Sequence, residues 1–99
     1  MLDSLSRDEF AGHLNTNFTV YFTPDTPIDA ELIEVTELQK RNRSESFALL
    51  FLTPSDTPIE QALYKVEHAV LGSAEIGLVP VGKDENGVRY EAVFNRIVD

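Results

Sequence analysis

The dipeptide Glu67-His68 is the part of this sequence that most resembles an acid–base pair. Histidine titrates near neutral pH and is the side chain most often used as a general base. Neighbouring residues on a β-strand point to opposite faces, so these two share a site only if a bulge re-aims one of them. His68 would otherwise take its carboxylate from Glu75 or Glu91 on a neighbouring strand. We therefore expect no catalytic residue, and an enzyme that uses Glu67, His68 or Glu91 is the least favoured class.

Other reactive combinations are weaker still. Ser73 follows Gly72, but the residues around it lack the G-x-S-x-G pattern of a nucleophile elbow. The sequence has no cysteine, which excludes thiolate nucleophiles and thiolate metal sites. Its two histidines, His13 and His68, lie far apart and show no zinc-ligand spacing. We expect neither a metal site nor a cofactor.

Polar and aromatic side chains of the later part of the chain are the candidate binding residues. Tyr and Arg are over-represented at protein interfaces, and here they are expected to be exposed on strands. The same residue types also occupy ordinary solvated sheet faces, which is the simpler interpretation. The candidates for a binding site are Tyr64, His68, Tyr90, Glu91, Asn95 and Arg96.

Composition indicates one globular domain over residues 1–99, because 42% hydrophobic and 25% charged residues are typical of such domains. The formal net charge of −9 disfavours nucleic acid and anionic membranes as partners, since both attract Lys and Arg. One basic cluster, from Lys40 to Arg43, is expected to lie in an exposed charged turn from Gln39 to Glu45. The N-terminus is acidic and lacks a secretory signal, so we expect a cytoplasmic protein.

A short N-terminal helix is predicted from Ser6 to Leu14. Ser6 and Glu9 have the spacing of a capping box, in which each side chain bonds to the backbone N–H of the other residue. Phe10 and Leu14 are four residues apart, so they are expected to form one apolar stripe. The helix should lie on a sheet or plug one end of a barrel.

Most of the remaining chain is typical of β-strands. From Asn17 to Phe22, Phe18 and Val20 alternate with polar neighbours, which predicts a half-buried strand. From Phe47 to Leu52 every residue is apolar, which predicts a central strand that is covered on both faces. From Gln61 to His68 the alternation places three side chains on one face, Tyr64, Val66 and His68, opposite Leu63, Lys65 and Glu67.

The stretch from Ala30 to Leu38 is ambiguous. Ile33 and Val35 alternate with polar residues, and we favour a strand with these two side chains on one face. Glu, Leu and Lys are also good helix formers, so a helix from Ala30 to Lys40 stays open.

The stretch from Ala74 to Arg96 is predicted to form a β-hairpin whose turn lies between Asp84 and Gly87, with Asn86-Gly87 as the favoured loop. The register predicts one face formed by Val79, Val81, Tyr90, Ala92 and Phe94, and the opposite face by Ile76, Leu78, Pro80, Glu91, Val93 and Asn95. Pro80 cannot donate to a ladder and should therefore lie at an open edge or a bulge. This edge is a candidate surface for self-association.

Six short strands with frequent turn signals predict a mainly β fold, a small antiparallel six-stranded barrel or sandwich with one short N-terminal α-helix. The strand order and the choice between barrel and sandwich stay open.

Several motifs resemble those of a family of small bacterial proteins of unknown function, over nearly the whole chain. They are Phe47-Ala48-Leu49-Leu50-Phe51, Gln61-Ala62-Leu63-Tyr64-Lys65-Val66-Glu67-His68, Leu71-Gly72, Leu78-Val79-Pro80-Val81-Gly82 and Tyr90-Glu91-Ala92-Val93-Phe94-Asn95. The resemblance implies a stand-alone bacterial domain, in a phage-tail-like or surface assembly, and it implies no catalytic residue.

We therefore expect a non-catalytic module that binds an unidentified protein partner or serves as a structural accessory. A β-barrel that binds a small ligand in its mouth or interior is the alternative.

Overall fold

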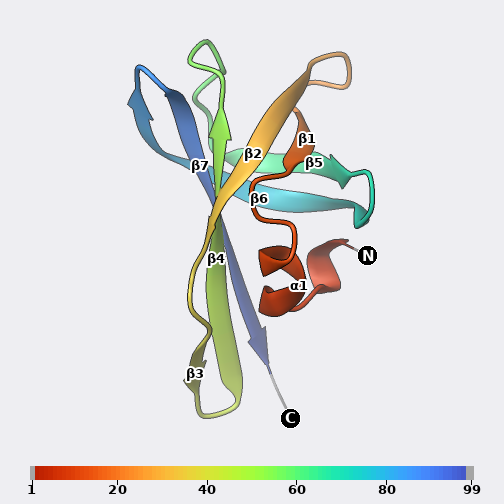
Figure 1. Cartoon of the computed structure of the whole chain (residues 1–99), viewed down its shortest axis with the longest axis vertical. Helices are drawn as coiled ribbons and strands as arrows, with labels where there is room; N and C mark the ends of the chain where they lie inside the picture. Colours follow the sequence, from red (N-terminus) through yellow and green to blue (C-terminus); the bar gives the residue numbers. More distant parts are fainter. Residues whose placement is uncertain (1, 98–99) are drawn as a thin grey trace.

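The protein chain is built from antiparallel strands that follow two short helical turns in the computed structural model, which describes residues 2–97 (Figure 1). Its elements are η1 (Leu2–Ser4), α1 (Arg7–Ala11), β1 (Asn17–Tyr21), β2 (Pro27–Val35), β3 (Gln39–Arg41), β4 (Ser44–Thr53), β5 (Ala62–His68), β6 (Gly72–Asp84) and β7 (Gly87–Ile97). The strand order β2-β1-β5-β6-β7-β4 is closed by pairing of β2 with β4, and β3 extends β4 as an additional strand. The expected mainly β fold is thus confirmed, as a closed six-stranded barrel.

Strand β6 changes partner halfway along its length. Residues 72–78 pair with β5, whereas residues 79–84 pair with β7, apart from the bulged Val81. In Figure 1, β5 and β6 consequently run across the long pair formed by β4 and β7. The N-terminal segment packs where β6 leaves β7: η1 contacts β6, and the ring of Phe10 stacks on Phe94 with 5.5 Å between centroids. The helix therefore closes one end of the barrel.

The predicted capping box is present. The backbone N–H of Glu9 donates to Ser6 Oγ over 3.1 Å, and the N–H of Ser6 donates to Glu9 Oε1 over 3.0 Å. The helix ends at Ala11 rather than Leu14, and Leu14 is 42% exposed, so the predicted Phe10–Leu14 stripe is wrong. The chain turns towards β1 there, since Asn15 takes a positive φ of 68° and its N–H donates to Leu32 O.

The barrel interior follows the predicted faces of β1 and β5. Phe18 and Val20 of β1 are buried, as are Tyr64 and Val66 of β5, while Leu63 points outward. Strand β4 is central, as expected, but its buried side chains all lie on one face, Phe47, Leu49, Phe51 and Thr53, and the outward side chains of the apolar run are partly exposed. The expectation of cover on both faces is therefore wrong. The expected turn from Gln39 to Glu45 is instead a hairpin between β3 and β4, with Asn42 at φ 55°.

The ambiguous stretch from Ala30 to Leu38 forms a strand, β2, which ends at Val35. Its predicted face was wrong, because a bulge lies between Leu32 and Glu34. Leu32 pairs with the buried Phe51 and Val35 pairs with the buried Leu49, so Leu32 and Val35 share the inner face. The extra residue at a bulge reverses the alternation, which a strict period of two does not anticipate.

The β6–β7 hairpin forms as predicted, with a different turn and a different face. Asp84 pairs with Gly87, so the loop residues are Glu85 and Asn86. A second bulge, at Val81, lies between the pairs Gly82–Arg89 and Pro80–Tyr90. Pro80 therefore shares the inner face with Tyr90, whereas Val79 and Val81 point outward and are 38% and 51% exposed. The predicted grouping of these valines with Tyr90 was wrong. The prediction that Pro80 lies at an open edge or a bulge is confirmed, because the bulge directly follows it.

Candidate functional site

The interior of the barrel is filled by side chains. Large side chains such as Tyr90, Phe18, Phe51, Leu32 and Leu78 are less than 2% exposed. A ligand in the interior would have to displace this core. Concave space is instead found on the surface, where the strands separate at the rim.

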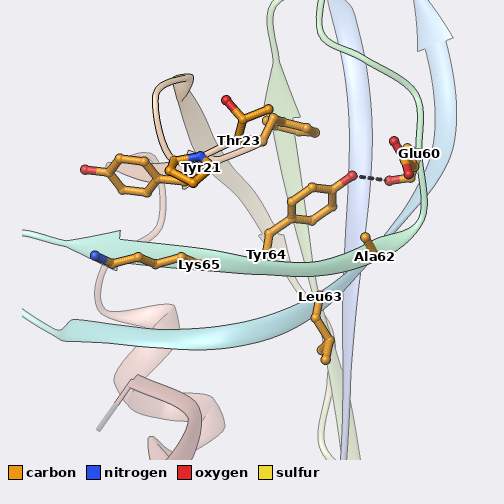
Figure 2. A pocket seen from close by; sticks show the side chains of 9 residues that line it. Tyr21, Thr23, Glu60, Ala62, Leu63, Tyr64 and Lys65 are labelled. Atoms are coloured by element: carbon orange, nitrogen blue, oxygen red, sulfur yellow. Dashed lines mark hydrogen bonds between the residues drawn. The ribbon is translucent and has the colours of Figure 1, made fainter.

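A cavity of about 460 Å³ lies at the rim where β1 ends and β5 begins (Figure 2). We call it the rim cavity. It is lined by Tyr21, Phe22, Thr23, Pro24, Glu60, Ala62, Leu63, Tyr64 and Lys65. Its volume lies within the range of specific small-molecule pockets, and its lining is rich in aromatic and apolar side chains, as in such pockets.

An aromatic cluster supports one wall of the rim cavity. The ring of Phe22 lies 4.6 Å from that of Tyr64 and 5.6 Å from that of Tyr90, measured between centroids. Tyr64 donates its hydroxyl hydrogen to Glu60 O over 2.5 Å (Figure 2). Burial raises the pKa of Tyr64 to about 12, so this hydroxyl stays a donor at neutral pH. The wall is therefore held by both packing and hydrogen bonds.

Charged side chains flank the mouth of the rim cavity. The Lys65 ammonium lies 5.2 Å from the ring centroid of Tyr21, a cation–π distance. A hydrogen bond with Glu67 raises the pKa of Tyr21. Glu60 lies at the opposite end of the lining in Figure 2. The lining thus contains one carboxylate, Glu60, and one ammonium group, Lys65, and Glu67 contacts the lining residue Tyr21.

Strand β5 presents an apolar surface on its other face, towards solvent. Leu63 is 70% exposed and points away from Tyr64 in Figure 2, as the alternation of a strand requires. It lies opposite Gly77 of β6, and a neighbouring hollow is shared by Leu63, Gly77, Val79 and Val93. Val93 is 56% exposed. We call Leu63, Val79 and Val93 the outer apolar strip.

The sequence-predicted binding residues do not converge on one site. Tyr64 and Tyr90 meet beside the rim cavity but are 6% and 0% exposed, so their predicted exposure was wrong. Glu91 and Asn95 lie on the outer face of β7, on either side of Val93. Arg96 lies at the helical end, where its guanidinium is 5.2 Å from the ring centroids of Phe47 and Phe94.

His68 does not line the rim cavity, and both of its ring nitrogens form hydrogen bonds within the fold. Its Nδ1 accepts from the N–H groups of Val70 and Leu71, so its Nε2 carries the hydrogen in the neutral ring. Nε2 then donates to Thr16 Oγ1 over 3.0 Å, and Thr16 donates to His13 O. The expected pairing with Glu75 or Glu91 is wrong, because His68 lies opposite Gly72. Desolvation and the nearby His13 lower the pKa of His68.

Sequence reasoning missed Tyr21, Phe22, Pro24 and Leu63 as site residues. The strand pattern predicted that Leu63 lies on the face opposite Tyr64, but exposure of a leucine alone does not identify a site. Tyr21-Phe22 directly precedes the turn rich in proline, which is a signal for aromatic side chains at a barrel rim. The separation of β1 from β5 at this point required the three-dimensional structure.

Neither a cluster of metal ligands nor a membrane-spanning helix is present within residues 2–97. In that range no group of three or more His, Asp or Glu side chains could hold a metal ion. No helix of the described chain is long and apolar enough to cross a membrane.

Comparison with curated proteins gave no significant match, and comparison with solved structures gave none either. A family model described as a domain of unknown function, DUF6916, matches residues 5–94. The match includes every strand from β1 to β6 and most of β7. The chain therefore belongs to the DUF6916 family, a domain of unknown function.

Proposed function

We propose that this protein is a non-catalytic interaction module that binds a partner protein through the outer apolar strip. The observation that carries the proposal is the exposure of Leu63, Val93 and Val79, which are 70%, 56% and 38% accessible. The barrel interior is already filled, so these side chains are not needed to complete the core. Exposed apolar side chains that gather around a hollow are typical of protein interaction sites.

Acidic side chains border the outer apolar strip. Glu91 borders the hollow next to Val93, and Glu75 borders another hollow that includes Leu63. Interfaces commonly combine an apolar centre with a polar rim. Together with the net charge of −9, this arrangement favours a partner that presents apolar side chains flanked by Lys or Arg. The same charge disfavours nucleic acid and anionic membranes as partners.

The resemblance noted in the sequence supports one specific form of this proposal, an accessory role in a phage-tail-like or surface assembly. A cytoplasmic location stays an expectation from the sequence.

Affinity purification from the protein's own host tests the proposal. The tagged wild-type chain is compared with Leu63→Asp and with a matched control, Val70→Asp, which changes a valine that is 74% exposed in the turn between β5 and β6. We expect one protein to copurify with wild type and control, and its recovery to fall roughly tenfold or more with Leu63→Asp. A set of copurified proteins that is the same for all three chains would remove the proposal.

The rim cavity favours a second candidate function, binding of a small amphipathic ligand. Its volume of about 460 Å³ and its aromatic wall suit such a molecule. Nuclear magnetic resonance of the labelled chain with a library of small aromatic fragments tests it. Fragments that shift the amides of Phe22 and Tyr64 support this function, and a library without such fragments argues against it.

A further inference from the structure

The edge of β5 is unpaired where it borders the rim cavity. Strand β1 pairs with β5 only at residues 65–67, and β1 then ends at Tyr21. The N–H of Phe22 donates to Thr26 O, so the chain turns back into β2 instead of continuing along β5. Residues 62–64 of β5 pair with β6 on their other side. Among the described residues no strand covers the β1 side of residues 62–64, and all three of them line the rim cavity.

We infer that the rim cavity receives an extended segment of a partner protein, which pairs with residues 62–64 of β5 as an additional strand. The inference rests on the proposed interaction function and names the kind of segment that is bound. Strand addition of this type obtains affinity from main-chain hydrogen bonds and specificity from pockets that take alternate side chains.

The rim cavity supplies such a pocket next to the unpaired edge. An added strand would lie about 5 Å from β5 and would direct every second side chain to the same face. The aromatic rings of Phe22 and Tyr64 lie on the inner side of β5 at this point, 4.6 Å apart. An apolar side chain of the segment would contact these rings while its neighbours in the segment point to solvent.

The charges favour a segment that is basic as well as apolar. Glu60 lines the rim cavity, and Glu67 lies beside it on the outer face of β5 with Tyr21. The ammonium group of Lys65, the one cation of the lining, lies over the Tyr21 ring. Electrostatic complementarity with a chain of net charge −9 therefore selects Lys or Arg next to the inserted apolar residue.

Two of the other open edges in the described chain, in β6 and in β3, are less suited to strand addition. Residues 79–84 of β6 pair with β7 alone, but Pro80 lacks an N–H group and the bulge at Val81 distorts the edge. Strand β3 pairs with β4 alone and exposes Lys40 and Arg41. Proline, bulges and charged side chains are the usual devices that protect sheet edges. Residues 62–64 contain none of these devices.

Selection from a random decapeptide display library against the full chain tests the inference. We expect enriched peptides with alternating apolar residues and at least one Lys or Arg. In nuclear magnetic resonance spectra of the labelled chain, these peptides should shift the amides of residues 62–64 and of Phe22. N-methylation of alternate peptide amides should weaken binding roughly tenfold or more, because it removes main-chain donors.

Two charge-reversal variants of the loop between β4 and β5 provide a matched pair. Glu60→Lys changes a residue of the cavity lining, whereas Asp56→Lys makes the same change at an exposed position outside it. We expect the first to weaken binding of the selected basic peptides several-fold more than the second. Equal effects of the two variants would contradict the inferred charge preference.

The outcomes separate this inference from the proposed function. A library without enriched peptides, or enriched peptides that bind equally well after N-methylation, would overturn strand addition. In that case, a host protein whose capture depends on Leu63 and also on Val93, which belongs to the outer apolar strip and not to the rim cavity, would leave the proposed function intact. Conversely, if no host protein is captured in a way that depends on Leu63, the proposed function is wrong, whether or not peptides are selected.

Discussion

Tyr64 and Tyr90 bind the same short stretch of the loop between β4 and β5. Their rings lie 6.3 Å apart in an edge-to-face arrangement with an interplanar angle of 81°. Tyr90 donates its hydroxyl hydrogen to Pro58 O and accepts from the N–H of Glu60 over 3.0 Å, while Tyr64 donates to Glu60 O. Two core side chains thereby fix the loop that forms one end of the rim cavity.

Replacing Tyr90 by Phe is expected to destabilise the fold and to loosen this loop. The variant leaves Pro58 O and the Glu60 N–H without their partner, which costs about 1–3 kcal/mol when such groups stay buried. Urea denaturation measures the loss, and hydrogen exchange of the Glu60 amide should become faster. Tyr21→Phe is the control and should change stability by less than about 0.5 kcal/mol, because Tyr21 lies at the surface. An unchanged exchange rate at Glu60 would contradict the assigned role of Tyr90.

Acidification below about pH 6.5 is expected to destabilise the protein through His68. Because the pKa of His68 is lowered in the fold, the unfolded chain binds a proton before the folded chain does. The contribution of His68 to the free energy of unfolding is therefore fully present above its pKa in the unfolded chain. It is lost as the pH falls towards the lower pKa that His68 has in the folded chain. Protonated Nδ1 can no longer accept hydrogen bonds from the N–H groups of Val70 and Leu71, so protonation of His68 destabilises the folded chain.

Urea denaturation at pH 8 and pH 5 checks this expectation against His68→Gln. The stability difference between wild type and variant should shrink at the lower pH, since only the wild type carries the titrating ring. If the stability difference between wild type and His68→Gln is the same at pH 8 and at pH 5, His68 does not cause the pH dependence.

Gly87→Ala is expected to be strongly destabilising. A Cβ at Gly87 would lie 2.0 Å from Thr53 O, a backbone atom that cannot move without breaking the β4–β7 ladder, and φ there is 142°. We expect a loss of about 3 kcal/mol or more, in the range of large steric and backbone effects. Thermal unfolding measures it.

Two other glycines separate the effect of steric contact from the effect of backbone strain. Gly72 has a φ of 96° but nothing within 4 Å of an added Cβ, so Gly72→Ala tests backbone strain alone and should cost about 1 kcal/mol. Gly82 is equally open and has no positive φ, so Gly82→Ala should be nearly neutral. Equal losses at Gly87 and Gly72 would show that contact with Thr53 is not decisive.

Pro80→Val is expected to increase self-association. The substitution supplies a backbone N–H at an edge that has β7 as its only partner strand within residues 2–97. Light scattering at increasing protein concentration measures the change, with Val79→Thr as a control that keeps the proline. Self-association of the wild type through this edge stays a prediction, and dimers that form equally in wild type and Pro80→Val would argue against a protective role of the proline.

Local signals predicted local structure well in this chain. The capping box at Ser6 and Glu9 and the alternation around Phe18 and Tyr64 each depend on a few neighbouring residues, and the structure confirms them. The two faces that were predicted wrongly lie next to bulges, at Ile33 and at Val81. A bulge depends on how a strand meets its partner, which a period of two along one strand does not contain.

The candidate site was less predictable than the fold. Tyr64 was named from its residue type, but its ring contact with Phe22 joins segments that are distant in sequence. The same holds for the hydrogen bond from the N–H of Glu60 to Tyr90, which are 30 residues apart. The unpaired edge of residues 62–64 arises because β1 ends at Tyr21, which pairs with Lys65, so no residue of β1 lies opposite residues 62–64. The sequence contains the turn at Pro24 but not the position of β5 beside it.

The ladder between β4 and β7 has a consequence for the order in which a growing chain can fold. It joins residues 44–53 to residues 88–97, the longest run of pairs in the barrel. During synthesis the β1–β2 and β3–β4 hairpins can form early, because each contains only neighbouring segments. Residues 49–52 of the apolar run can pair with β2 early, but the other edge of residues 47–52 stays open until β7 has been synthesised. Such delayed pairing exposes apolar strands to aggregation. This run is therefore the part of the nascent chain that a chaperone is most expected to bind.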